Sequence, residues 1–519
     1  MTRLFRLGSF PLLVLVASCS GPDAPKTTDP PTLTRAELLS PETCGKCHTD
    51  HYREWSTSMH AYAAKDPLFI AMNKRGQEET HGELGNFCVN CHAPMAAHEL
   101  GDGGETTIDP ETIPNELQGV TCYFCHDVQS VEGTHDNPLV LSNGVTMRGA
   151  IARFPKNGDT PAVQYGAHIA DSSPLQNSAN LKSANLCGAC HDIVVPAHFS
   201  GADAGSGDGV PLERTFKEWN ESAFGPKGTQ PFSCAGCHMN PDPRGVVPIA
   251  SPPDATSVMP ARNRHIHTFA AVDSAFADPD ETVRTAQLAE IRHFLDTELR
   301  IEVCVDMQAG NIQFTLENLA AGHKFPSGAS QDRRFWAEME VTDGTKTFTI
   351  GKIGPTENVV DFDVSPGENL TYPLLRDRTT KRDGSPAHMF WDVANIEDRT
   401  LPVAPPGDLN GNALSYRFPE TLTKVQRPTS VKIRAWLEPV GRDVIADLVA
   451  SGHIDPDSTI GQMLAAGTLP RYSIIPKRTT AVVPDDAWSI EWERSVAQAD
   501  GGPGYDANTT YRCLQTHTL

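Results

Sequence analysis

Hydrophobic residues change their pattern several times along the 519-residue chain. One continuous apolar run, residues 10–17, follows Arg3 and Arg6. It is far shorter than the roughly 20 residues of a membrane-spanning helix, so it predicts a signal peptide over residues 1–18 and export of the chain. The next segment, residues 19–37, is rich in Pro, Thr and Asp and is expected to be a disordered tether.

Further along, the spacing of apolar residues changes from helical to alternating. Behind an acidic start at Asp280, apolar residues recur at helical spacing as far as Leu299, which predicts a helix over residues 276–300. Beyond it, short segments alternate or are rich in β-branched residues, with turns between them. These segments are residues 300–305, 312–316, 335–341, 347–350 and 431–436. Residues 301–519 are therefore expected to form an all-β domain, a sandwich.

Ten of the 13 cysteines occur in one repeated pentapeptide, Cys-x-x-Cys-His. Residues i, i+3 and i+4 lie on one face of a helical turn, so both thiols can bond the vinyl groups of a porphyrin while the histidine reaches its iron. This spacing is the attachment signature of c-type haem, and we expect five covalently bound haem c groups with the motif histidines as proximal iron ligands. The five copies are Cys44, Cys47 and His48; Cys88, Cys91 and His92; Cys122, Cys125 and His126; Cys187, Cys190 and His191; and Cys234, Cys237 and His238.

Two other uses of paired cysteines fit this pattern less well. Zinc ribbons need paired Cys-x-x-Cys elements in even numbers and no histidine after each one. A redox-active dithiol normally occurs once, near a βαβ pattern. Five copies, each followed by histidine, favour haem attachment.

The five motifs are too close together for a separate apolar core around each porphyrin. The porphyrins are therefore expected to form much of the core of a pentahaem domain over residues 38–275, with short helices and long loops wrapped over them. The expected fold class is α+β. A mostly helical, loop-rich haem domain is followed by the all-β domain at the C-terminal end.

Three cysteines lie outside the motifs. Cys19 follows the small residues 16–18 at the end of the apolar run, which resembles a bacterial lipobox, so Cys19 is predicted to be lipidated and to anchor the chain to a membrane. Ordinary signal cleavage near Ala17 is the alternative. Cys304 and Cys513 are expected either to form a disulfide or to be two unrelated thiols, since connectivity cannot be read from sequence.

Each haem iron has a second, distal face. A histidine there gives a low-potential electron carrier, a methionine raises the potential, and a vacant face permits substrate chemistry. The candidate distal histidines are His60, His98, His168, His267 and His323. Other residues that could take this role are His135, His198, His265, Met59, Met95 and Met239, and the methionines are more typical of packing. A surface or hydrogen-bonding role is the alternative for each histidine.

A short internal repeat lies within the haem domain. Residues 54–58 match residues 218–222 at a Glu-Trp-x-x-Ser core, two positions before His60 in the first copy and Phe224 in the second. The second copy is therefore expected to keep the helix while lacking the metal ligand.

The charge of the chain excludes one class of partner. It has 43 basic and 65 acidic side chains and a formal net charge of −22, which makes a nucleic-acid partner improbable. The propionates of five haems would make the surface more negative still, which favours a basic docking partner.

The motif series over about residues 40–270 resembles the multihaem cytochrome c superfamily that contains the tetrahaem electron-acceptor cytochrome of nitrifiers and, more distantly, octahaem hydroxylamine oxidoreductase. The residues that carry the resemblance are Cys44 to His48 with Tyr52, Trp55, Ser58 and His60; Gly119 to Asp127; Cys187 to Asp192; Glu218 and Trp219; and Cys234 to Met239. The resemblance implies stacked haems that pass electrons along a chain, usually with bis-histidine iron, and favours His60 as a distal ligand. The chain departs from these relatives in having five motifs, and it has no Cys-x-x-Cys-Lys motif of the kind that holds the catalytic haem of ammonia-forming nitrite reductase.

We therefore expect electron transfer by a lipid-anchored pentahaem cytochrome c in the bacterial envelope, between redox partner proteins. A periplasmic or cell-surface location is expected, with the outer membrane favoured because Ser20 rather than an acidic residue follows the lipidation site. A further expectation is that the β domain docks the chain into a larger electron conduit.

The alternative is a multihaem oxidoreductase that acts on a small nitrogen or sulfur compound at one open haem. Asp127 and Asp192, each directly after a motif histidine, could then serve as acid–base groups. Their other role is local hydrogen bonding. The electron-carrier prediction needs no catalytic residue.

Overall fold

The computed structural model describes residues 32–150, 167–197, 209–251, 261–276, 281–306, 311–342, 345–359, 374–408, 411–418, 430–474, 489–491 and 511–515. Three predictions fall outside these residues: the signal peptide, the lipidation site Cys19, and His198, one of the further possible distal ligands. None of the helices described is both long and apolar enough to span a membrane.

The haem region is built of short helices, and each motif lies within one of them or at its end. They are α1 (Arg35–Leu39), α2 (Pro41–Gly45), α3 (Thr49–Ser56), α4 (Met59–Tyr62), α5 (Pro67–Glu79), α6 (Val89–His92), α7 (Pro94–Leu100), α8 (Cys122–Asp127), α9 (Ser183–Gly188), α10 (Thr215–Asn220) and α11 (Cys234–His238). The first of these starts inside the predicted tether, because Thr34 and Glu37 form a reciprocal capping box that fixes its N-terminus.

Pairs of short strands link the motif helices, which the sequence pattern did not predict. The antiparallel pairs are β1 (Val128–Val131) with β2 (Leu139–Leu141), β5 (Ile193–Val195) with β6 (Val210–Glu213), and β7 (Pro241–Pro248) with β8 (Ala261–His265). One pair is parallel, β3 (Thr146–Gly149) with β4 (Ile169–Ser172). Six of these eight strands have only three or four residues, which is too short to show an alternating pattern. The longer pair, β7 and β8, is rich in proline and arginine and has no alternating apolar residues.

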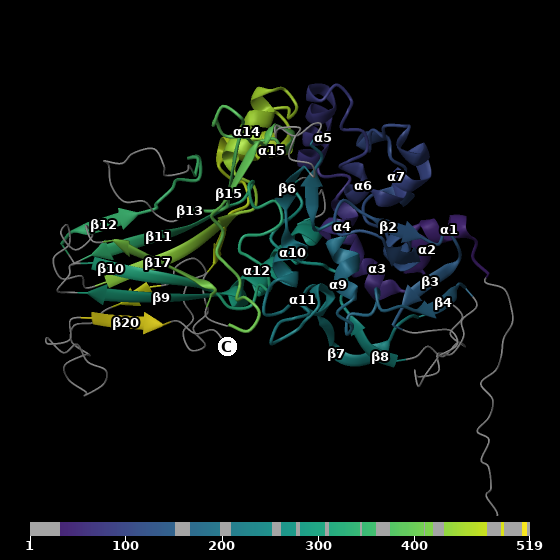
Figure 1. Ribbon diagram of the computed structural model, residues 1–519, viewed down its shortest axis with the longest axis horizontal. Coiled ribbons are helices and arrows are strands. Elements are labelled where there is room, and N and C mark those ends of the chain that lie inside the picture. The colour runs from purple at the N-terminus through teal and green to yellow at the C-terminus, as the bar shows by residue number, and fades with distance from the viewer. Residues whose placement is uncertain are drawn as a thin grey trace, which may run out of the picture.

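Helix α12 (Glu281–Glu298) lies within the range predicted for a linking helix and leads directly into the first strand of two antiparallel sheets. The first sheet has the order β16 (Ala413–Phe418), β10 (Asn311–Asn318), β9 (Leu299–Asp306), β20 (Tyr511–Gln515). The second has the order β12 (Thr347–Ile350), β11 (Arg334–Thr342), β17 (Ser430–Glu438), β18 (Tyr472–Ile474), with β13 (Leu374–Leu375) on β11 and β19 (Ser489–Glu491) on β17. Figure 1 shows these sheets at one end of the molecule and the motif helices at the other.

One hydrophobic core joins the two sheets to α12. It includes Leu316 from β10, Phe335 from β11, Leu437 from β17 and Ile291 from α12. Phe335 and Leu437 are direct partners in the β11–β17 register, so their side chains lie on the same face of the second sheet.

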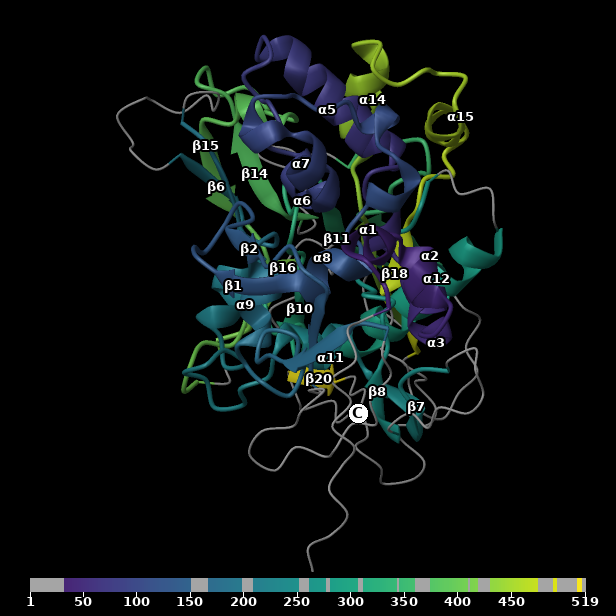
Figure 2. The same ribbon diagram turned by 90° about the vertical axis from the view of Figure 1, so that its right-hand side faces the viewer.

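The C-terminal segment also contains helices, which differs from the all-β expectation. Helices α14 (Arg442–Ala450) and α15 (Thr459–Ala466) pack with α5 in a second core that includes Leu68, Val444 and Leu448. Both views place α5 beside α14 (Figures 1 and 2). The N-terminal and C-terminal parts of the chain therefore share a core across the predicted domain boundary.

Candidate haem-binding site

All five motifs line one continuous cavity of about 1760 Å³. Every one of the ten motif cysteines and five motif histidines contributes to its wall. Within the described part of the chain, no three histidine, cysteine or carboxylate side chains converge on a point that could hold a bare metal ion, as a zinc ribbon would require.

Each motif forms the single helical turn that haem attachment needs. The histidine N–H donates to the carbonyl of the first cysteine in three motifs, at 2.8 Å from His48 to Cys44, 3.1 Å from His92 to Cys88 and 3.0 Å from His191 to Cys187. The other two motifs lie within α8 and α11, whose N-termini are capped by the Thr121 and Ser233 hydroxyls.

Backbone carbonyls fix the orientation of the motif imidazoles. In four motifs Nδ1 lies within hydrogen-bond distance of a carbonyl oxygen, to which it donates. Metal-bound histidines typically donate their second ring N–H in this way, which leaves Nε2 for the metal. The donor and acceptor residues are His48 and Ile249, His92 and Ala63, His126 and Arg148, and His238 and Ala270.

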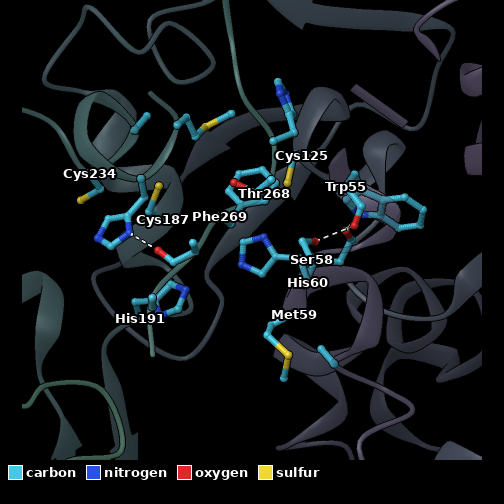
Figure 3. Close-up of a pocket in the computed structure, with 18 of the residues that line it drawn as sticks. Trp55, Ser58, Met59, His60, Cys125, Cys187, His191, Cys234, Thr268 and Phe269 are labelled. Atoms are coloured by element: carbon cyan, nitrogen blue, oxygen red, sulfur yellow. Dashed lines mark hydrogen bonds between the residues drawn. The ribbon is translucent and has the colours of Figure 1, made fainter. Parts of the chain in front are cut away.

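Four histidines from outside the motifs each face a different motif histidine at nearly the same separation. No motif histidine is shared between two of them. The ring centres are 6.3 Å apart for His48 and His168, 6.3 Å for His191 and His60, 6.5 Å for His126 and His267, and 6.4 Å for His238 and His323. Figure 3 shows His60 and His191 in the cavity.

These separations fit a haem iron between each pair. Two imidazoles on opposite faces of one metal, each bound at about 2 Å through a nitrogen about 1 Å from its ring centre, have centres about 6 Å apart. Three of the outer histidines also donate from Nδ1 to a backbone carbonyl. These donors are His168 to Ile169, His267 to His265 and His323 to Lys324.

Burial lowers the pKa and so favours the neutral imidazole at His48, His60, His126, His191, His238, His267 and His323. It lowers the pKa of His48 and His191 to about 4 and the pKa of His60 and His267 to about 3. Metal binding requires the neutral imidazole, so these rings are ready to act as ligands at neutral pH.

The fifth motif histidine, His92, differs from the other four. Among the residues that the structure describes, no histidine ring faces it at a comparable separation. Its ring instead stacks on Phe69 of α5, with centres 4.2 Å apart and planes 6° from parallel. One helical turn further along α5, Asn73 lines the cavity and its Oδ1 has no hydrogen-bond partner in the described part of the chain.

His98 is the candidate ligand that the structure does not bring to the cavity. Its side chain is 40% exposed on α7 and lies 3.8 Å from Glu99. The helix restarts at Pro94 directly after the second motif, which turns His98 away from the cavity wall. Two of the further possible distal histidines have other partners. His135 is exposed beside Asp136, and His265 forms hydrogen bonds with Ser178 and the Met239 carbonyl.

Of the three candidate methionines, Met59 and Met239 line the cavity. Met95 is fully buried in the hydrophobic core of the haem region. The Met59 sulfur lies 3.8 Å from the Gln287 amide.

Two residues at the site were not singled out from the sequence. His51 is buried, with its pKa lowered by burial to about 2, and its ring meets His267 edge-on at 4.7 Å. Phe269 packs on His60 at 4.5 Å and has φ of 49°, a conformation that a bulky residue rarely adopts. Neither feature has a signal in the sequence, because both depend on contacts between distant segments.

Asp127 and Asp192 are both occupied by structural partners. Asp127 is fully buried and accepts from the Ser142 hydroxyl and the Asn143 N–H. Asp192 is paired with Arg214 at 2.7 Å. Neither residue is among those that line the cavity. This arrangement fits the hydrogen-bonding role rather than acid–base chemistry on a substrate.

Cysteines of different motifs lie against each other inside the cavity. A thiol–thiol hydrogen bond lowers the pKa of Cys44 and raises the pKa of Cys122. The same kind of contact raises the pKa of Cys234 beside Cys187 and of Cys190 beside Cys91. The motifs are therefore close enough for their porphyrins to be neighbours.

Comparison with known proteins agrees with this site. Residues 43–127, which contain three of the motifs, match the family described as cytochrome c554 and c-prime. The fold is similar to the crystal structure of a penta-heme cytochrome c552 from Thermochromatium tepidum, with a TM-score of 0.53 and 18% sequence identity over 85% of this chain and 98% of that chain. No curated protein matches the chain.

Together with the five attachment motifs, these similarities support a multihaem c-type cytochrome that binds haem c covalently. The similarity to the penta-heme cytochrome c552 concerns the fold. The match to the cytochrome c554 and c-prime family covers the first three motifs.

Proposed function

We propose that this chain transfers electrons through five closely spaced haem c groups, four of which have a histidine on each side of the iron. The observation that carries this proposal is the one-to-one pairing of four motif histidines with four outer histidines in a single cavity. Bound there, haem supplies a reversible one-electron centre, and the protein's part is to attach it, choose its ligands and exclude water.

The thiol contacts suggest the order of the haems. Each cysteine bonds the edge of its own porphyrin, so contacts between cysteines of two motifs place two porphyrin edges together. The contacts join the first motif to the third, the second to the fourth and the fourth to the fifth. Burial and the nearby Cys187 raise the pKa of Cys125 to about 12, so the third motif also lies beside the fourth. The proposed path therefore runs 1–3–4–5, with the second haem joining at the fourth.

The setting of this electron path is proposed from the sequence. Lipidation at Cys19 would hold the chain at a membrane of the bacterial envelope, and the acidic surface would favour basic donor and acceptor proteins. The two sheets at the end of the molecule are a candidate docking module for a larger conduit (Figure 1).

Haem counting combined with a redox titration tests the proposal. The purified full-length holoprotein should contain five haems per chain and take up five electrons in overlapping steps at low potential. Fewer than five haems, or haems that exchange no electrons with an added redox mediator, would overturn it.

A second candidate function rests on His92. With no described histidine opposite it, the haem of the second motif is the candidate for an open iron, at which a small nitrogen or sulfur compound could be oxidised or reduced. Cyanide or nitric oxide should then bind to one haem per chain. Failure of both ligands to bind would leave the enzyme hypothesis without a site.

A further inference from the structure

The two Glu-Trp-x-x-Ser segments make the same set of contacts. In the first copy, the Trp55 indole N–H donates to the Val120 carbonyl at 2.8 Å, and the Val120 N–H donates to the His60 carbonyl at 2.9 Å. The Ser58 hydroxyl donates to the Trp55 carbonyl at 2.7 Å. The backbone at Gly119 lies very close to the His60 carbonyl oxygen, since a Cβ added to Gly119 would be only 2.4 Å from it.

The second copy repeats these bonds residue for residue. The Trp219 indole donates to the Phe232 carbonyl at 2.8 Å, and the Phe232 N–H donates to the Phe224 carbonyl at 2.9 Å. The Ser222 hydroxyl donates to the Trp219 carbonyl at 2.8 Å. The equivalence extends beyond the sequence match, since Val120 and Phe232 each stand two residues before the first cysteine of a motif.

The glutamate of each copy binds a different loop of the haem site. Glu54 accepts from the backbone N–H of His267 at 3.0 Å and also forms a buried ion pair with Arg264. Glu218 accepts from the backbone N–H of Lys324, next to His323, at 3.2 Å and from the Ser327 hydroxyl at 2.7 Å. Each carboxylate thus holds the segment that carries an outer histidine.

Within each copy, the glutamate and the tryptophan act on opposite sides of the same haem site. The Trp55 indole is bonded to Val120, two residues before the third motif, whose His126 faces His267. The Trp219 indole is bonded to Phe232, two residues before the fifth motif, whose His238 faces His323. Two neighbouring side chains on one short helix therefore connect the proximal and distal ligands of one haem.

We propose that each Glu-Trp-x-x-Ser segment is a duplicated clamp that sets the distance between the two axial histidines of one haem, with Glu54 and Glu218 as positioning residues for His267 and His323. This inference rests on the proposed histidine pairs. It assigns a function to residues that are not candidate iron ligands.

The clamp also explains the one ligand that differs between the copies. In the first copy, His60 projects beyond the clamp and faces His191 of the next motif along the haem path. The second clamp serves the last motif in the chain, and Phe224 stands in the equivalent position. With no later motif to supply, a ligand is not needed there.

Five variants of the full-length holoprotein, one of them a control, test the clamp by electron paramagnetic resonance. His323→Ala and His267→Ala identify which low-spin signal belongs to each haem. Glu218→Ala should then weaken the His323 signal with a matching gain of high-spin iron and leave the His267 signal intact. Glu54→Ala should do the reverse. Glu221→Ala, an exposed glutamate at the end of the same helix as Glu218, is the matched control and should change neither signal.

The outcomes separate the clamp from the proposed function. If the histidine variants produce high-spin iron while both glutamate variants keep all low-spin signals and all midpoint potentials, the clamp is refuted and the electron-transfer proposal stands. If His323→Ala and His267→Ala produce no high-spin iron, the histidine pairs are wrong and both proposals fail. Should Glu218→Ala not fold, Trp219→Phe replaces it: loss of the indole N–H should shift the midpoint potential of the His323 haem alone, and no shift refutes the clamp.

Discussion

The imidazole rings of His238 and His323 lie with their centres 6.4 Å apart and their planes 11° from parallel. His238 ends the fifth haem motif, whereas His323 stands in the turn between β10 and β11. The sheet region therefore contributes a residue to the haem site, and the two parts of the chain are joined through one haem as well as through the α5–α14 core.

This relationship predicts the effect of changing His323. His323→Met should keep the haem low-spin but raise its midpoint potential, because thioether ligation favours the reduced iron. A potentiometric titration followed optically should show one haem displaced to higher potential and the others unchanged. His98→Met, on the exposed face of α7, is the control and should leave every potential in place. A shift with the His98 variant and none with the His323 variant would reverse the assignment.

A buried charge near the haem region predicts a large stability effect. The Arg334 side chain is completely buried, and its guanidinium contacts both carboxylate oxygens of Asp443 at 2.7 Å. Asp443→Ala removes this bidentate partner of a fully buried guanidinium, and breaking a buried ion pair typically costs about 3–5 kcal/mol. Denaturant unfolding should show the loss. Asp457→Ala, an exposed aspartate between α14 and α15, should stay close to the wild type, and an equal loss in both variants would contradict the explanation.

The raised pKa of Glu213 predicts that the free energy of unfolding depends on pH. It lines the cavity, and burial, reinforced by Asp332 and Asp273, raises its pKa from 4.5 to about 7, against the opposing effect of Arg333. Between these two pH values the folded chain keeps a proton that the unfolded chain releases, so this group lowers stability as the pH rises and its full cost is reached above about pH 7.

Glu213→Gln removes that cost. The melting temperature of the variant relative to the wild type should therefore be higher at pH 8 than at pH 4.5. Glu221→Gln, which is exposed, provides the comparison and should give the same difference at both pH values. A Glu213→Gln difference that does not change with pH would show that the side chain is solvated in the folded protein.

The positions of Cys304 and Cys513 predict a disulfide bond between them. Cys304 and Cys513 are direct partners in the antiparallel register of β9 and β20. Opposite residues in such strands have Cα atoms about 4.5–5.5 Å apart, within the range that a disulfide spans. Peptide mapping without reduction should recover the two cysteines in one linked peptide. Recovery of both as alkylated free thiols would favour the alternative of two unrelated cysteines.

The sequence was informative for the haem motifs and for the longer strands, which are local features. The Cys-x-x-Cys-His turns and the longer strands are visible from spacing alone, and the predicted strand segments 312–316 and 335–341 lie inside β10 and β11. In contrast, α14 was missed although Val444, Ile445 and Leu448 have helical spacing.

Pairing of the histidines could not be predicted, because it depends on contacts between distant segments. His60 follows the first motif closely in the sequence but faces His191 of the fourth. His98 follows the second motif even more closely, and the turn at Pro94 directs it to the surface. The Glu-Trp repeat was visible, but its role depends on the bonds from Glu54 and Glu218 to segments far along the chain.

The electron paramagnetic resonance spectrum of the fully oxidised holoprotein tests the central claim most directly. Four low-spin haems and one high-spin haem per chain are predicted, and cyanide should convert only the high-spin one. The four low-spin haems correspond to the four histidine pairs, and the high-spin haem corresponds to the site of His92. Fewer than four low-spin haems would contradict the paired-histidine arrangement.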